Sequence, residues 1–286
     1  MKTLLIATDF SANARHAADY GYNLAKHIKA NVLLCNAVMV PSEIPQAGGV
    51  VWPAEEYDLL MDDSAEGLKQ LRKHLEHKDY TAGFHPAITC TNSAGTVTDV
   101  VNNIISTHEI EMVVSGTHGS SSLSQFLLGN HSKAIINGVQ KPVLLIPHMA
   151  VIEPVKKIAF AVDFEAPEKD VENIYALIPL AKRLNAEILI THVYKEKYEA
   201  PAFKQWIGEL LTQISNKANY PNIYYRVIKS ENTENGLNWL CAHGQIDMLA
   251  MIHRPHNFFE NIFEGSHTQK MAGHINIPLL VFSSLN

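Results

Sequence analysis

Short runs of hydrophobic residues alternate with longer amphipathic stretches along the whole chain. Runs such as 3–7 and 31–38 have the length of strands and contain few polar residues. Stretches such as 14–25 place apolar residues at the three- and four-residue spacing of a helix. Uninterrupted apolar strands are covered on both faces, as in a parallel sheet with crossover helices. The pattern therefore predicts an α/β protein with five strands and about four helices in each half of the chain.

The order of these segments occurs twice. Residues 2–10 resemble residues 157–164, and each segment ends in an Asp-Phe pair. Later segments correspond in the same way: 31–38 with 186–193, 110–115 with 246–251, and 141–147 with 277–282. The repeat predicts two tandem domains, 1–148 and 154–286, each a doubly wound parallel five-stranded sheet. A short linker between Pro147 and Pro154 joins them.

Composition and charge exclude several classes of protein. The chain has 286 residues, of which 47% are hydrophobic and 18% charged, so it is neither disordered nor fibrous. No apolar run approaches the roughly 20 residues of a membrane helix, and the apolar start is too short for a secretion signal. A net charge of −6 argues against nucleic acid or anionic membranes as partners. Three dispersed cysteines are typical of reduced thiols, so we expect a cytoplasmic protein.

The segment 115–132 carries the candidate chemistry. It is rich in glycine and serine, follows the fourth predicted strand and precedes a helix that begins near His131. Ligands of open α/β sheets bind at the carboxyl ends of the strands. Glycines there allow a phosphate to approach the backbone N–H groups, and a helix N-terminus adds unpaired donors. The segment can therefore bind a phosphate without a lysine, which suits an acidic protein.

The spacing Gly116-x2-Gly119-x9-Gly129 resembles the nucleotide loop of the universal stress protein family. The flanking segments 112–119 and 141–147 are similar to that family as well, and the resemblance covers the whole chain as two tandem copies. It implies an adenine nucleotide alpha hydrolase-like, Rossmann-like fold. It also implies ATP or a related adenine nucleotide as ligand, with Mg²⁺ as a candidate companion ion, and a role in stress response or signalling.

The resemblance also assigns roles to residues. Asp9 and the backbone near Val38 would face the adenine and the ribose. The positions that would surround the ribose and phosphates are Gly116, His118, Gly119, Gly129, Asn130, His131 and Ser132. In the family, the final strands of two copies pair to form dimers. The tandem chain can satisfy this pairing internally, as a pseudo-dimer, and a further homodimer stays open.

The sequence departs from the family pattern in both halves. Asn130 stands where the family has Ser or Thr, although its amide can still donate to a phosphate. In the second half, Ile252 and Pro255 stand where Gly116 and Gly119 stand in the first. Proline has no N–H, and the branched Cβ of isoleucine keeps a ligand away from the backbone. Asp163 and the final positions Gly265, Ser266 and Thr268 keep the pattern, so we interpret the second site as degenerate.

Plainer interpretations apply to several of these residues. Asp9 and Asp163 are suited to capping the helices that follow them, and the glycines to ordinary turns. No Cys or carboxylate completes a convincing metal-binding set with the histidine pairs His74/His77 and His253/His256, so packing or solvated roles are favoured over a metal site. The chain has neither a Gly-x-Ser-x-Gly elbow nor a Walker loop. Any ATP hydrolysis would be slow, because no evident base or arginine finger faces the phosphates.

The leading hypothesis is a cytoplasmic, nucleotide-responsive binding protein with one intact-looking site in the first half. An unknown protein partner would sense the bound state, and the protein would not be a dedicated enzyme. Two rival hypotheses remain: an interaction protein that binds no nucleotide, and a slow ATP hydrolase.

Overall fold

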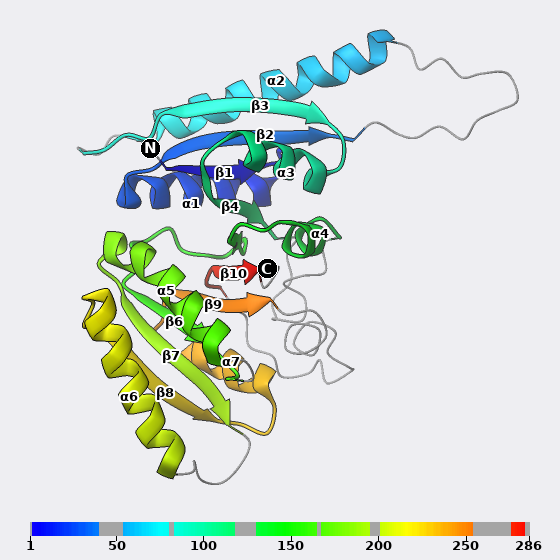
Figure 1. The fold of residues 1–286 in the computed structure, drawn as a ribbon. Helices are drawn as coiled ribbons and strands as arrows, with labels where there is room; N and C mark the ends of the chain where they lie inside the picture. Colours follow the sequence, from blue (N-terminus) through cyan, green and yellow to red (C-terminus); the bar gives the residue numbers. More distant parts are fainter. Residues whose placement is uncertain are drawn as a thin grey trace, which may run out of the picture.

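The computed structural model describes residues 2–39, 54–79, 83–117, 130–164, 167–194, 201–253 and 276–283. The described strands form one ten-stranded, mostly parallel sheet with helices on both faces (Figure 1), so the predicted α/β class is confirmed. The first five strands are β1 (Thr3–Ala7), β2 (Asn31–Val38), β3 (Ile88–Ala94), β4 (Ile110–Gly116) and β5 (Val143–Ile146). The other five are β6 (Lys157–Ala161), β7 (Glu187–Tyr194), β8 (Ile223–Lys229), β9 (Met248–His253) and β10 (Leu279–Ser283).

The order of the strands shows the repeat directly. The sheet runs β3-β2-β1-β4-β5-β10-β9-β6-β7-β8, so each half has the same doubly wound order. Within a half the neighbouring strands are parallel, and the two halves meet where β5 and β10 pair antiparallel. In that junction Leu144 lies opposite Leu280. The two expected five-stranded sheets are therefore continuous with each other through their last strands.

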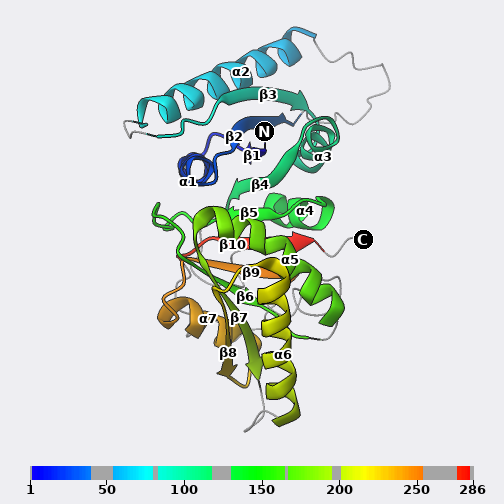
Figure 2. The same cartoon turned by 60° about the vertical axis from the view of Figure 1, so that its left-hand side comes forward.

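Helices lie on both sides of the twisted sheet (Figure 2), and the two buried clusters assign them to two layers. One layer consists of α1 (Ala12–Ile28), α2 (Ala54–His77), α5 (Pro167–Leu184) and α6 (Pro201–Ala218). The other consists of α3 (Val97–Thr107), α4 (Asn130–Gly138) and α7 (Thr233–His243). Among the residues that the structure describes, no helix is both long and apolar enough to cross a bilayer.

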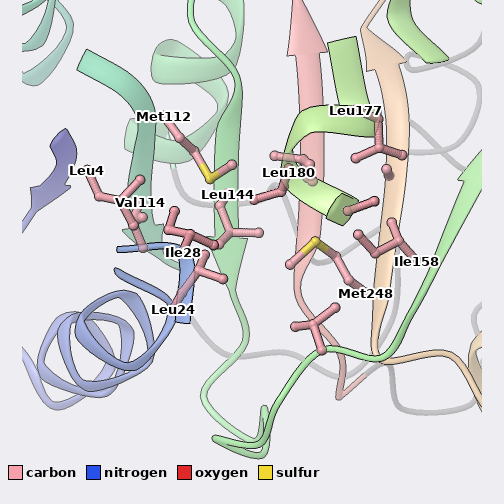
Figure 3. Close-up of a cluster of buried hydrophobic side chains, with 14 of the residues drawn as sticks. Leu4, Leu24, Ile28, Met112, Val114, Leu144, Ile158, Leu177, Leu180 and Met248 are labelled. Carbon is pink, nitrogen blue, oxygen red and sulfur yellow. The ribbon is translucent and has the colours of Figure 1, made fainter. Parts of the chain in front are cut away.

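The hydrophobic core continues across the boundary between the halves. Leu24 and Ile28 of α1 belong to the same buried cluster as Leu177 and Leu180 of α5, with Leu144 between them (Figure 3). A second cluster on the other face joins α3 and α4 to β10 and α7. Each face of the sheet therefore has one core that both halves share, which ties their stabilities together.

An ion pair reinforces this boundary. Arg183 of α5 donates to both carboxylate oxygens of Glu111 on β4, at 2.8 Å from Nη1 to Oε2 and with a second contact from Nη2 to Oε1. Lys2 adds a third donor, 3.2 Å from Glu111 Oε1. Partial burial raises the pKa of Glu111, but the hydrogen bonds from Arg183 and Lys2 outweigh it and leave that pKa below its usual range. The pair therefore holds the two halves together as a charged contact at neutral pH.

The connecting segment between the halves contacts the body of the protein at both of its ends. On its first part, the Ala150 carbonyl lies 2.9 Å from Nε2 of His16 on α1. At its far end, the Asp247 carboxylate accepts hydrogen bonds from the backbone N–H groups of Lys156 and Lys157, at 2.7 and 2.8 Å. Met149 and Val151 are 58% and 65% exposed. The predicted domain limits, 1–148 and 154–286, stay a prediction.

Candidate functional site

A cavity of about 250 Å³ lies at the carboxyl ends of β1, β2 and β4. The chain reverses its direction along the sheet between β1 and β4, and such a switch point is where α/β sheets bind ligands. The first turns of α1, α3 and α4 reach the cavity through Asn13, Val97 and Ser132. Its apolar lining residues include Ala37, Met39, Val97, Val100, Val101 and Ile135. Its polar lining residues include Thr8, Asp9, Asn13, Asn36, Ser115, Thr117 and Ser132.

Asp9 lies at the mouth of this cavity, directly after β1. Its Oδ1 accepts a hydrogen bond from the backbone N–H of Ser11 at 3.0 Å. The cap of α1 is Ser11, whose side-chain oxygen accepts from Ala14 N at 3.2 Å. The structure therefore separates the two roles that the sequence left open: Ser11 caps the helix, and Asp9 lines the cavity.

Phe10 holds Asp9 in place through an unusual backbone conformation. Its φ of 63° lies in the left-handed region, which costs a residue with a side chain about 1–2 kcal/mol. Two contacts stabilise this conformation. Phe10 N donates to Thr8 Oγ1 at 3.0 Å, and the ring lies so close to Gly67 of α2 that a Cβ there would be 2.8 Å from Cζ. The counterpart Phe164 has a φ of 58°, so the repeat preserves this turn.

Two asparagines, which the sequence analysis did not single out, organise the cavity walls. Asn36 Nδ2 donates to Thr8 O at 2.7 Å, and Asn36 Oδ1 accepts from Ser64 Oγ of α2 at 2.7 Å. Asn13 Nδ2 donates to Thr117 O at 3.1 Å and fixes the chain as it leaves β4. A polar residue inside the apolar run of β2 was the available signal for Asn36. No comparable signal marks Asn13, because its partner is 104 residues away.

Gly116 ends β4 and lines the cavity where the strand passes closest to α1. A Cβ at this position would lie 2.8 Å from Asn13 O and 3.0 Å from Asn13 C. Such contacts with backbone atoms are too short for any side chain to relieve by rotation. Glycine is therefore required here because of space, in addition to the backbone access that the sequence pattern suggested.

The other predicted residues divide into three groups. Ser132 is 2% exposed and lines the same cavity as Asp9 and Gly116. Val38 is buried beside the cavity without lining it, and its carbonyl accepts from Gly95 N at 3.0 Å. The predicted positions His118, Gly119 and Gly129 lie outside the described residues, and for Asn130 and His131 only the backbone in α4 is described.

The electrostatic character of the cavity follows from its helix ends. Neither α1 nor α4 carries an acidic residue in its first turn, so no side chain of that turn offsets the partial positive charge of the N-terminus. The first turn of α3 does carry an acidic residue, Asp99. Among the described lining residues Asp9 has the single charged side chain. Any anion would therefore be held here by backbone N–H groups and hydroxyls.

The second half has larger side chains at the corresponding edge. In the sheet, Ala7 of β1 lies beside Cys35 of β2 and Ser115 of β4, and Ala161 of β6 lies in the same way beside Thr191 of β7 and Met251 of β9. The residues that follow these neighbours therefore correspond as well: His192 to Asn36, and Ile252 to Gly116. The His192 ring contacts Phe164, with 5.7 Å between ring centroids, and its Nδ1 lies 3.0 Å from Val162 O.

The charge at this second edge differs as well. The first turn of α5 carries Glu168 and Asp170, and Asp170 is fully buried. Lys29 and Asn185, both in the left-handed conformation, follow α1 and α5 directly. Counted back from these two residues, Asp170 corresponds to Ala14, which lines the cavity of the first half. A buried acid thus takes the place of a small neutral residue. The counterparts Pro255, Gly265, Ser266 and Thr268 lie outside the described residues.

Metal binding finds no support in the described part of the chain. No group of three or more His, Cys, Asp or Glu residues there is arranged to hold a metal ion. His74 pairs with Asp19, with 2.9 Å between Nε2 and Oδ1. His256 lies outside the described residues.

The reactivity of the three cysteine thiols tests whether Cys35, which lines the cavity, is buried. Burial raises the pKa of Cys35 and of Cys241 to about 12. Partial burial raises the pKa of Cys90 as well, but this residue is exposed, on the edge strand β3. We expect one thiol per native chain to react rapidly with a polar disulfide reagent at pH 8, and three after denaturation. The Cys90→Ser variant should lose the rapid phase. Rapid reaction of that variant would show that Cys35 or Cys241 is more accessible than the structure indicates.

The same thiols predict a change in stability at high pH. Between the ordinary thiol pKa of 9.0 and the folded value of about 12, the unfolded chain loses these protons and the folded chain keeps them. The free energy of unfolding should therefore fall as the pH rises from 9 toward 12. Urea titrations at pH 8 and pH 10 would measure this loss, and Cys35→Ala should reduce the difference between the two titrations.

Comparison with known proteins places this α/β protein, with its cavity at the switch point, in a family. Residues 1–147 match the model of the universal stress protein family. Universal stress protein MJ0531 of Methanocaldococcus jannaschii is 25% identical over 145 residues, which cover 51% of this chain and 81% of that protein. The chain belongs to the universal stress protein family, and the resemblance drawn from the glycine spacing is confirmed.

Solved structures show the same fold over nearly the full length. A universal stress protein from Archaeoglobus fulgidus superposes with a TM-score of 0.67 at 18% identity, covering 98% of this chain and 96% of that one. A protein from Pseudomonas aeruginosa UCBPP-PA14 described as a universal stress protein gives a TM-score of 0.55 at 10% identity, with 99% and 92% covered. The two-half arrangement is therefore shared with other proteins of similar length.

Proposed function

We propose that this universal stress protein binds one adenine nucleotide, ATP or a relative, in the cavity of its first half and acts as a cytoplasmic binding protein rather than a dedicated enzyme. The observation that carries the proposal is the convergence of Asp9, Gly116 and Ser132 on one cavity at the switch point of the sheet. These three residues come from distant parts of the sequence and were selected by the family pattern alone.

The apolar and the polar lining residues suit the two parts of a nucleotide. The three valines of α3 and Ile135 of α4 offer apolar surface to a flat base. Asp9 is available to ribose hydroxyls, and the first turns of α1 and α4, which carry no acidic residue, favour phosphates. A cavity of about 250 Å³ is near the lower end of ligand pockets, so it suits a nucleoside, with the phosphates extending toward Ser132.

Magnesium fits this proposal as a companion of the ligand. Mg²⁺ in nucleotide sites is held mainly by phosphates, water and one or two carboxylates. The described lining offers the carboxylate of Asp9 and no second one. We therefore propose that Mg²⁺, when present, arrives with the phosphates and is not held by the protein alone.

The cavity is connected to α2 by two contacts that flank Asp9. Thr8 is linked to Ser64 through Asn36, and the Phe10 ring lies on Gly67. A ligand that binds Asp9 would favour the conformations in which both contacts are intact. We propose that α2 is the element through which a protein partner senses occupancy.

Calorimetric titration of the nucleotide-stripped protein with ATP and AMP tests the proposal. We expect about one site per chain, an affinity at least about tenfold weaker in Asp9→Ala, and no change in the matched second-half variant Asp163→Ala. If Asp163→Ala lost binding and Asp9→Ala did not, the nucleotide site would lie in the second half and the proposal would be wrong. Heat from two sites would contradict the degenerate second site.

If no binding heat were found, the rival hypothesis of an interaction protein that binds no nucleotide would be favoured. In that case Asn130→Ser, which restores the family pattern, should create binding that the wild type lacks. Steady release of ADP that disappears in Asp9→Ala would instead favour slow ATP hydrolysis.

A further inference from the structure

Helix α2 presents a solvent-exposed stripe with opposite charges at its two ends. Core contacts of the helix run through Ser64, Leu68, Leu71 and Leu75, which are all buried. On the opposite side, at alternating spacings of three and four residues, the exposed positions are Leu59, Asp62, Glu66, Lys69 and Lys73. The stripe is therefore acidic in its first part and basic in its second, with an exposed leucine at the acidic end.

The helix dipole does not account for this separation of charge. Its effect falls off within the first and last turns of a helix, and α2 has 24 residues from Ala54 to His77. Glu66 and Lys69 lie in the middle of the helix, well beyond that range. Their own ion pair, with 3.2 Å between Lys69 Nζ and Glu66 Oε2, leaves the side chains 61% and 51% exposed. Both remain accessible to a partner.

Leu59 adds exposed apolar area to the stripe and is 64% exposed, whereas Leu60 lies four residues before the buried Ser64, on the side of the core contacts. The helix lies along the outer end of the first half, on the side away from the second half, in both views (Figures 1 and 2). No other element in the described part of the chain covers the stripe, so it is placed to meet another molecule.

We propose that this stripe is the contact surface between two copies of the chain, with the two α2 helices packed antiparallel. A twofold axis between Glu66 and Lys69 brings Glu66 opposite Lys69 of the second copy. The same operation brings Asp62 opposite Lys73, because four residues separate the charges on each side. Each contact then occurs twice, and Leu59 covers the last turn of the second copy's helix.

The charge pattern also explains why a parallel arrangement is disfavoured. In a parallel pair, acidic residues would face acidic residues and basic residues would face basic ones, which is repulsive at both ends. Antiparallel pairing converts all four contacts into attraction. Because the pairs are exposed, the association is salt-dependent.

Sedimentation analysis of the full chain, with and without charge-swapped variants, tests this surface. The wild type is expected to form dimers at 0.05 M salt, with a dissociation constant at least about tenfold weaker at 0.5 M. The variant D62K/E66K and the variant K69E/K73E should each be monomeric. A mixture of the two should form a one-to-one heterodimer, because one α2 stripe is then fully basic and the other fully acidic.

The matched control E209K/E231K changes exposed residues of the second half and shifts the net charge as much as D62K/E66K does. It should dimerise like the wild type. A wild type that is monomeric at 0.05 M salt and 100 μM protein, dimers that persist in both swapped variants, or a mixture that stays monomeric would each overturn the proposal. Circular dichroism of each variant verifies that the exposed substitutions leave the fold intact.

Discussion

Replacing Gly116 by valine is expected to destabilise the protein by about 3 kcal/mol and to abolish ligand binding in the first half. The reason is the 2.8 Å separation between a Cβ at this position and Asn13 O. Either the end of β4 or the start of α1 must move, and both form the cavity. Urea unfolding would measure the stability, and calorimetric titration with ATP the binding.

The repeat supplies the control for this substitution. Ile252 takes the corresponding position in the second half and already has a branched side chain, 5% exposed. Ile252→Val should therefore cost only about 1 kcal/mol and leave binding unchanged. If Gly116→Val kept the wild-type stability, the contact with Asn13 would not be the reason for glycine at this position.

The second large effect is expected where the halves join. Leu144 and Leu280 lie opposite each other across the antiparallel strands β5 and β10, and both are fully buried. Leu144→Ala and Leu280→Ala should each lower the free energy of unfolding by about 3–5 kcal/mol. Because the side chains share one contact, the double variant should deviate from additivity by at least about 0.5 kcal/mol.

This result would also show whether the two halves unfold together. With a shared core, each substitution should move a single urea transition of the whole chain. The exposed control Val151→Ala should change stability by less than about 0.5 kcal/mol. If urea unfolding showed two transitions and Leu280→Ala moved only one of them, the two halves would not share a common core.

Much of the fold could be predicted from the sequence because the signals were local and repeated. Continuous apolar runs indicated strands covered on both faces, and the second Asp-Phe pair at 163–164 indicated a duplication. The junction of β5 with β10 came only through the family resemblance. An apolar run shows that a strand is buried, but it does not identify the neighbour that buries it.

The candidate site could be predicted only in part. Asp9, Gly116 and Ser132 follow a family spacing, and the structure brings them to one cavity. Asn36 and Asn13 were missed because their hydrogen bonds join residues 28 and 104 positions apart. The backbone near Val38 was expected to face the adenine and the ribose; its neighbours Ala37 and Met39 line the cavity, and the role of Val38 itself stays a prediction.

The short connecting segment has a consequence for how the two halves assemble. Because β5 and β10 pair directly and the cores are shared, the segment 147–156 joins two surfaces that already fit each other. The second half therefore binds the first as a tethered partner, at an effective concentration set by a short linker with contacts at Ala150 and Lys156. Cleavage of the exposed peptide bonds beside Met149 would cut this linker while the two halves stayed associated, leaving one folded unit made of two chains.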